Sequence, residues 1–332
     1  MLNGGRDWLA RTVEEPIQAD LPICDPHHHL WDLPGDRYQL AELRQDTGSG
    51  HRIETTVFVE CGSAYRPDGP EALRPVGETV YAADQAAASA DRGGARIAGI
   101  VAFADLMLGG AVEEVLVAHE RAGGGRFRGV RHRAAWDADR PSRGKSHLTP
   151  PGLLGRPDFR QGIGVLARLG YRFDAWVYHP QLPEVTDLAR AFPELPIVVD
   201  HLGGPLGSGR YAGRRAEVRA EWRRSMAELA GCGAVTVKLG GIGMEAYGLG
   251  WEHGERPPTS EQLAEAWTPE IEFCIEQFGA GRCMFESNFP VDRQSTSYLV
   301  LWNAFKRMAA GVSPSERAAL FHDTATRFYG LA

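Results

Sequence analysis

Short apolar runs alternate with longer segments of helical character along most of the chain. The apolar runs are four to eight residues long and rich in β-branched and aromatic side chains, as is typical of buried parallel strands. Eight strands are therefore expected, at residues 21–24, 53–60, 96–103, 127–132, 172–178, 195–200, 234–239 and 282–287. Helices are expected at residues 78–91, 110–121, 158–169, 182–191, 216–230, 269–278, 298–308 and 313–328. Asp158 is expected to cap one helix, and Pro269 to lie in the first turn of another.

This repeated alternation predicts an α/β fold in which a parallel sheet closes into a (β/α)8 barrel. The alternative is an open doubly wound sheet, which typically carries a glycine-rich phosphate turn after its first strand. Here that position holds three consecutive histidines, so the barrel is favoured. Long loops rich in Gly, Pro and Arg follow three strands, and we expect them at the C-terminal face, where barrels build active sites. They span residues 137–157, 203–213 and 240–258.

No internal repeat or low-complexity linker divides the sequence, so a single barrel domain is expected over residues 1–332. It would include an N-terminal extension at 1–20 and a closing helix within 313–332. The formal net charge of −7, without a long basic run, gives no electrostatic case for nucleic acid. No run approaches the ~20 apolar residues of a membrane span, and no secretory signal is recognisable. Five scattered cysteines fit a reducing cytoplasm. The oligomeric state stays open, with a homo-oligomer among the alternatives.

Histidines mark the ends of several expected strands. His27 and His29 share one face of an extended strand and are expected to point into the barrel mouth, while His28 points away. Two imidazoles so placed could bind one divalent metal, or a lactone or carboxylate oxygen. The alternative for an individual histidine is a structural bond to a backbone carbonyl. In a closed barrel the other strand ends would converge on the same cavity, and they carry His132, His179 and His201.

Charged side chains inside the expected strands are the second group of candidates. Lys238 and Arg131 need a buried anion or a bound substrate, because an unpaired buried charge is costly. Arginine matches carboxylate geometry with two hydrogen bonds, so Arg131 is the preferred anchor for a substrate carboxylate. Lys238 could hold another carboxylate or polarise a carbonyl, and the alternative is a structural ion pair. Glu60 and Glu286 are the candidates for a general base.

The strand-end motifs resemble the amidohydrolase-related family of the amidohydrolase superfamily, and its sugar-lactone and 2-pyrone-4,6-dicarboxylate lactonases in particular. The likeness extends from about residue 20 to the end, and its segments are ICDPHHHLWD, VVDHLGGP, VKLGG, RCMFESNFPVD and TATRFYGL. The first two segments together are specific for the superfamily but weak on substrate. The resemblance implies a distorted barrel in which His27, His29 and His179 hold one divalent metal, zinc or manganese, with His201 beside them. Some relatives place a lactone carbonyl there without a metal.

The strand-eight motif departs from this family at one position. Relatives use an aspartate there as general base, and the matching residue here is Asn288. An amide cannot take a proton from water near neutral pH and has no charge to hold a cation. The base is therefore expected to be a histidine such as His179 or His201, or another carboxylate, among which Asp292 joins the two glutamates. The alternative is that the reaction is not ordinary hydrolysis. Asp292 and His132 are also expected among the substrate contacts.

The expected function is hydrolysis of a cyclic ester in a small carboxylated metabolite. Water would attack a carbonyl that a metal or the histidines polarise. One alternative is a metal-dependent non-oxidative decarboxylase of the same superfamily, which would need a firmly bound metal. Another is a binding protein that kept the fold without activity. The many histidines and charged strand residues argue against the latter, because burying them without a function is costly.

Overall fold

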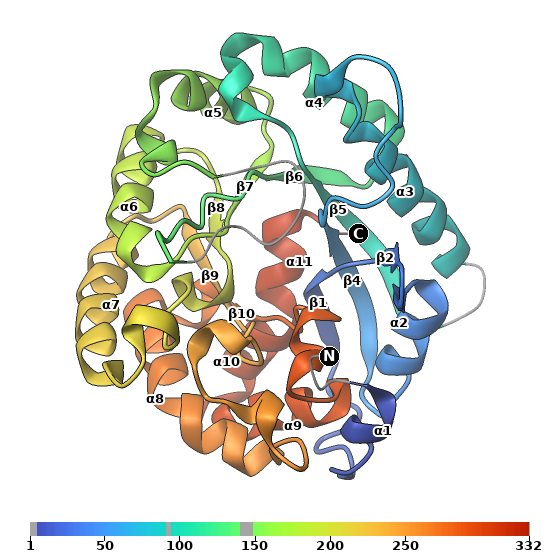
Figure 1. The fold of residues 1–332 in the computed structure, drawn as a ribbon, viewed down its shortest axis with the longest axis vertical. Helices are drawn as coiled ribbons and strands as arrows, with labels where there is room; N and C mark the ends of the chain where they lie inside the picture. The colour runs from blue at the N-terminus through green and yellow to red at the C-terminus, as the bar shows by residue number, and fades with distance from the viewer. Residues whose placement is uncertain (1–4, 91–93, 140–148, 332) are drawn as a thin grey trace.

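Eight parallel strands form the centre of the molecule, and helices surround them (Figure 1). The computed structural model describes residues 5–90, 94–139 and 149–331. The strands are hydrogen-bonded in their order along the chain. They are β1 (Ile23–His28), β4 (Ile53–Val59), β5 (Arg96–Ala102), β6 (Phe127–Arg131), β7 (Arg172–Ala175), β8 (Ile197–Val199), β9 (Val235–Leu239) and β10 (Cys283–Phe285). All eight expected strands are confirmed, although β1 begins later than expected and extends to His28.

The segment that follows β10 closes the sheet against β1. The backbone N–H of His29 donates to the carbonyl of Phe289 at 2.7 Å, and that of Asn288 donates to the carbonyl of His27 at 2.9 Å. A parallel bridge pairs His28 with Phe289. Because β10 itself has only three residues, the barrel closes through this following segment rather than through a full ladder. The expected (β/α)8 barrel is therefore confirmed, in a distorted form.

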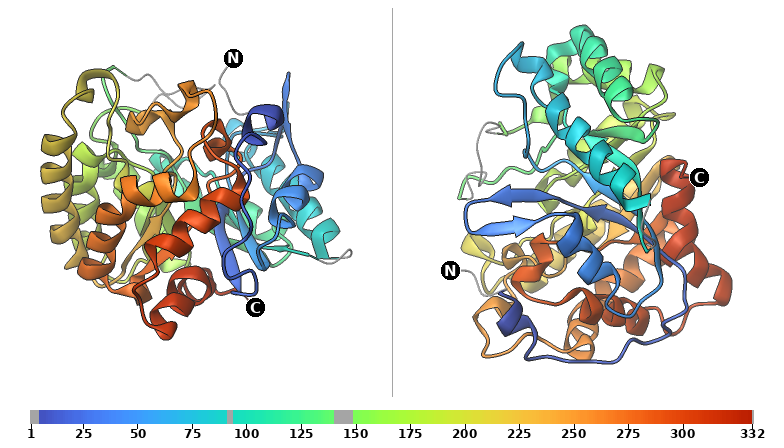
Figure 2. Two further views of the ribbon diagram at one scale, coloured as in Figure 1. Left: turned by 90° about the horizontal axis from the view of Figure 1, so that it is seen from below. Right: turned by 90° about the vertical axis from the view of Figure 1, so that its right-hand side faces the viewer.

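Each strand is followed by at least one helix, and the helices cover the outside of the barrel (Figure 2). Because the barrel closes on itself, its apolar strands are covered by neighbouring strands and by helices. The helices are α1 (Arg6–Leu9), α2 (Leu40–Thr47), α3 (Val76–Ala90), α4 (Val112–Ala122), α5 (Pro157–Arg168), α6 (Leu182–Ala191), α7 (Arg215–Ala230), α8 (Ser260–Phe278), α9 (Tyr298–Met308), α10 (Pro314–Ala318), a π-helical turn (Ala319–Asp323) and α11 (Thr324–Tyr329). None of these is long and apolar enough to cross a membrane.

Two expected helix starts are wrong. Pro269 lies inside α8, because Thr259 caps an earlier start by accepting a hydrogen bond from the backbone N–H of Gln262. Asp158 does not cap α5, since Pro157 already occupies the first helical position. Its carboxylate lies in the first turn, where it complements the helix dipole.

The barrel interior is apolar at the bottom and polar at the mouth. At the bottom, Val57, Val101, Val198 and Met284 pack against the C-terminal helix α11, whose Tyr329 is fully buried. An antiparallel hairpin that the sequence pattern did not predict, β2 (Trp31–Leu33) with β3 (Asp36–Tyr38), extends from the end of β1 at the other face. The interior therefore has one closed end, and chemistry is restricted to the end where the strands terminate.

Candidate active site

The three histidines at the end of β1 lie on opposite sides of the barrel wall, as predicted. The rings of His27 and His29 are 4.9 Å apart, and both face the interior cluster described below. His28 points outward, where its Nε2 lies 3.0 Å from the hydroxyl of Thr56 and its ring edge meets Phe58. Burial lowers the pKa of His28 to about 3. His28 is therefore a neutral packing residue, and the strand presents two imidazoles to the site.

His201 is held by a carboxylate from the end of β10, two strands further along the sheet. Its Nδ1 lies 2.6 Å from Oε1 of Glu286, and its backbone N–H donates to the same oxygen at 3.0 Å. In the tautomer that carries its proton on Nδ1, facing the carboxylate, Nε2 is the ring nitrogen that can accept a proton. The edge of Trp176 packs on the His201 ring at a centroid distance of 4.6 Å. In this pair the Glu286 carboxylate orients the His201 imidazole, an arrangement in which a histidine can act as a general base.

The second oxygen of Glu286 faces His27. Its Oε2 lies 2.7 Å from His27 Nδ1, yet it makes no hydrogen bond of suitable geometry with the described residues. The His27 and His201 rings are 4.6 Å apart. One donor atom from each of His27, His201 and Glu286 lies within 4.8 Å of the others, which is a spacing that suits one divalent ion. The orphaned carboxylate oxygen and the two imidazoles fit such an ion.

The group of His27, His201 and Glu286 shares only His27 with the expected metal ligands, which also included His29 and His179. His29 donates through Nδ1 to the carbonyl of Val59 at 2.8 Å, and its Nε2 lies 3.3 Å from the side-chain oxygen of Asn288. His179 lies in a turn after β7, where its Nδ1 accepts from the backbone N–H of Leu206 and its ring meets Tyr211. His179 Nε2 has no hydrogen-bond partner among the described residues. The roles predicted for His29 and His179 stay predictions.

Glu60 forms a salt bridge with two arginines at the mouth. Arg131 and Arg133 each place Nε 2.8 Å from Glu60 Oε1. Burial alone would raise the pKa of Glu60, but the two guanidinium groups lower it to about 2. A carboxylate with such a low pKa is a poor general base. Arg133 was not predicted, although it lies two residues beyond Arg131 and thus on the same face of the strand.

Lys238 lies deeper than the arginines and is fully buried. Its ammonium contacts Asp174, Asp200 and His27, and it is not among the residues that line the cavity. Burial disfavours the charged form, but Asp174 and Asp200 outweigh it and raise the pKa of Lys238 above its usual range. The structural ion pair that the sequence left as the alternative is thus present, without direct access to a substrate.

Asn288 links His29 to a buried acid. Its side-chain N–H donates to Asp292 Oδ1 at 2.8 Å, and the backbone N–H of Gly243 donates to Oδ2 of the same carboxyl at 2.8 Å. Burial raises the pKa of Asp292 to about 7. The predicted proximity of Asp292 to the site is therefore observed, although Asp292 does not line the cavity.

His132 was predicted as a site residue, but it packs among apolar side chains. Its ring packs between Phe103 and Phe159, and its Nδ1 accepts from the backbone N–H of Leu106. These partners belong to the layer between barrel and helices. The structure therefore does not bring His132 to the cavity, and its predicted substrate contact finds no support in its position.

A cavity of about 220 Å³ opens above the histidines. Two indoles flank it, and neither was predicted as a site residue. Trp176 follows Asp174 by two residues, so alternation along the strand could have indicated its direction, whereas Trp31 belongs to the unexpected hairpin. The lining consists of His29, Trp31, Cys61, Arg131, Arg133, Trp176, His201, Met244, Asn288 and Val291. It combines cationic, aromatic and imidazole groups, which suits a small anionic ring.

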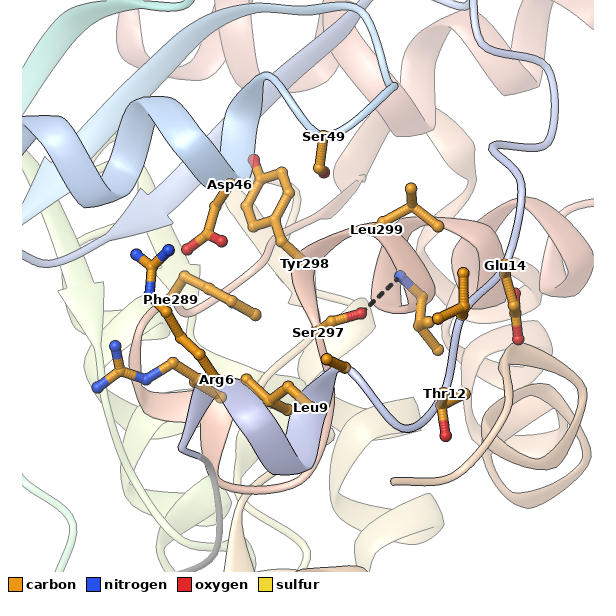
Figure 3. A pocket seen from close by; sticks show the side chains of 14 residues that line it. Arg6, Leu9, Thr12, Glu14, Asp46, Ser49, Phe289, Ser297, Tyr298 and Leu299 are labelled. Atoms are coloured by element: carbon orange, nitrogen blue, oxygen red, sulfur yellow. Dashed lines mark hydrogen bonds between the residues drawn. The ribbon is translucent and has the colours of Figure 1, made fainter. Parts of the chain in front are cut away.

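A second hollow of about 300 Å³ lies outside the barrel, between the N-terminal segment and α9 (Figure 3). Arg6 and Leu9 of α1 face Tyr298 and Leu299 of α9 across it, and Phe289 forms part of its wall. None of the imidazoles of the cluster lines it. The chemistry therefore belongs to the cavity at the barrel mouth.

Comparison with known proteins agrees with this geometry. The family model described as amidohydrolase matches residues 24–331. The chain belongs to the amidohydrolase family. A Sinorhizobium fredii protein named y4mH is 34% identical over 94% of this chain and 99% of its own. The L-fucono-1,5-lactonase of Burkholderia multivorans is 29% identical over 92% of this chain and 95% of its own. An amidohydrolase from Burkholderia multivorans, solved with bound zinc, is 26% identical with a TM-score of 0.73, covering 93% of this chain and 99% of its own.

Proposed function

We propose that this hydrolase opens a lactone ring in a small carboxylated metabolite. The observation that carries the proposal is the His201–Glu286 pair, which presents an imidazole lone pair to a cavity walled by arginine and tryptophan. A relative named as a lactonase over nearly the full length supports the same reaction class. An imidazole base beside cationic groups is suited to the hydrolysis of a lactone that carries negative charge.

The reaction needs one proton acceptor and one site for negative charge. Water attacks the lactone carbonyl carbon, the ring C–O bond breaks, and a hydroxy acid results. His201 Nε2 takes the proton from the attacking water and returns it to the leaving alkoxide oxygen. Glu286 keeps the His201 ring in the required orientation and stabilises the imidazolium that forms.

The two arginines are the groups that recognise negative charge. Arg131 is fully engaged, because it also contacts His27 and Asp200 through Nη1 and the Glu60 carbonyl through Nη2. The Arg133 side chain is 37% exposed, so it can reach a carboxylate in the cavity. Arg131 is paired with both Glu60 and Asp200, whereas Arg133 shares only Glu60 among the ion pairs of the described residues. Arg133 is therefore the proposed anchor, and Arg131 its rigid support.

A divalent ion, when bound, would polarise the carbonyl and acidify the attacking water. His27, His201 and Glu286 are the residues that would hold it, and zinc or manganese suits their nitrogen and oxygen donors. In that state His201 is a ligand, and in the metal-free state it is the base. Both states depend on Glu286 and on the same imidazole.

The test is a lactone panel assayed with the purified protein before and after dialysis against chelator, and again with ZnCl2 or MnCl2. The panel contains neutral sugar lactones and carboxylated lactones. We expect turnover that His201→Asn reduces about 10²- to 10⁴-fold, the usual contribution of a general base. Turnover that survives metal removal assigns His201 as base, whereas turnover that returns only with metal assigns it as ligand. Absence of turnover on every lactone in all states would overturn the proposal.

A further inference from the structure

The interior of the barrel contains a buried cationic side chain, the ammonium group of Lys238. Lys238 projects from β9 into a fully buried space below His27. Its Nζ lies 2.7 Å from Asp174 Oδ2, 3.0 Å from Asp200 Oδ1 and 3.1 Å from His27 Nδ1. Three acceptors around an ammonium group match its three N–H donors.

The same three partners are the donor types that a divalent ion prefers. Two carboxylate oxygens and one imidazole nitrogen, from β7, the end of β8 and β1, converge on a single point. Carboxylate oxygens and imidazole nitrogens are ligands of zinc and manganese, but here they surround an ammonium group. Among the described residues, the donor atoms that lie within 4.8 Å of one another are those of His27, His201 and Glu286. Asp174 Oδ1 makes no hydrogen bond among the described residues, so that carboxylate has capacity beyond what the lysine uses.

His27 belongs both to this group and to the group with His201 and Glu286. The cluster thus contains two cation positions that share one imidazole. The upper position is open toward the cavity through His201, which lines it, while the lower position is closed by the apolar floor and by Tyr329. The Tyr329 hydroxyl donates to Asp174 at 2.7 Å, which fixes that carboxylate from below.

We propose that the ammonium group of Lys238 permanently occupies a second metal position, so that the cluster accepts at most one exchangeable divalent ion. Lys238 is then a positioning residue that replaces a metal, rather than an anchor for substrate. It holds Asp200 and His27 in place and compensates two buried carboxylates, which would otherwise be strongly destabilising. This inference concerns the number of bound ions and does not rest on the proposed function.

The experiment counts metal ions on the purified full chain. Wild type, Lys238→Ala and Lys238→Met are dialysed against MnCl2 or ZnCl2, then freed of loose metal, and the metal content is measured by mass spectrometry. Removing the lysine side chain in the alanine variant opens space for an ion, and we expect one more ion per chain than in wild type. The methionine side chain fills the same space, so that variant should bind no additional ion.

Two further variants identify the position of the additional ion. Asp174→Asn in the Lys238→Ala background removes one proposed ligand, and we expect the extra ion to be lost. Lys306→Ala removes another buried lysine, whose Nζ contacts the Gln18 carbonyl and His51 outside the cluster. Its metal content should equal that of wild type.

Thermal unfolding gives a second measurement. A bound ion stabilises the folded state by mass action, so MnCl2 or ZnCl2 should raise the Tm of Lys238→Ala more than that of wild type or Lys238→Met. An alanine variant that folds but binds no additional ion would overturn the proposal. So would an extra ion that persists without Asp174, or an alanine variant that stays unfolded in the presence of metal.

Discussion

The backbone N–H and the Nδ1 of His201 both bond to one oxygen of Glu286, at 3.0 and 2.6 Å. These residues follow β8 and β10, and β9 lies between the two strands. The contact can cross the end of β9 because two glycines follow that strand. A Cβ on Gly240 would lie 2.3 Å from Glu286 Cγ, and a Cβ on Gly241 would lie 2.7 Å from the His201 ring. The LGG sequence is thus a steric requirement of the imidazole–carboxylate pair.

Adding one methyl group at Gly240 should therefore disable the site. Gly240 has an ordinary backbone φ, so Gly240→Ala acts through the clash with Glu286 and not through backbone strain. We expect kcat for the lactone to fall at least tenfold, because ångström-scale displacements of catalytic groups cost about that or more. Gly233→Ala is the matched control, since nothing lies within 4 Å of its added Cβ. Equal kcat values for the two variants would show that the pair tolerates displacement.

Removing the charge of Glu286 should lower turnover with little effect on substrate binding. Glu286→Gln keeps the size of the side chain, but it no longer stabilises an imidazolium on His201. We expect kcat to fall about 10²- to 10⁴-fold with KM little changed, because the lost interaction belongs to the transition state. Steady-state kinetics on the best lactone of the panel measure both constants. A rise in KM alone would instead place Glu286 among the groups that bind the ground state.

The sequence predicted the fold better than it predicted the arrangement of the site. Apolar runs identify buried strands because burial on both faces removes polar residues, and eight of them interspersed with helices allow few topologies. The boundaries of β1 were harder, because Asp25 and the histidines are polar yet buried inside that strand. Asp25 is satisfied there by the N–H of Ser287 and the hydroxyl of Tyr298, which are partners more than 250 residues away.

Separation along the sequence also explains why the grouping of the site residues was not predicted. His27 and His201 were named from their strand ends and Glu286 from inside an expected strand, but their grouping depends on the staggering of strands around the closed barrel. That staggering is set by many small packing contacts and is not visible in local patterns. Lys238 shows the same limit, since a buried charge in a strand indicates a partner without telling whether that partner is substrate or protein. Arg133 could have been found by simple alternation from Arg131.

Arg133 offers a test of substrate charge. Arg133→Met keeps much of the aliphatic stem but removes the guanidinium that faces the cavity. We expect KM for carboxylated lactones to rise about 10- to 100-fold, the value of one charge-assisted hydrogen bond, with a smaller effect on neutral lactones. Arg128→Met is the control on the same strand, because within the described residues the Arg128 side chain bonds to the carbonyls of Gly125 and Phe127 and to no other group. An equal rise for neutral and carboxylated lactones would exclude Arg133 as a charge-recognising residue.

Asp292 predicts a pH dependence of stability. Burial raises its pKa from 3.8 to about 7, so in this interval the folded state binds one proton more than the unfolded state. Stability from this group is complete below pH 3.8 and is lost as the pH rises through 7, at about 1.4 kcal/mol per pH unit. Asp292→Asn removes the titration, and its amide can still bond to Asn288 and Gly243 after rotation of the two side-chain amides. Between pH 5 and 8 the unfolding free energy of the variant should gain about 2–3 kcal/mol relative to wild type. Urea unfolding at four pH values measures this gain, and parallel curves for the two proteins would show that Asp292 is already ionised at pH 5.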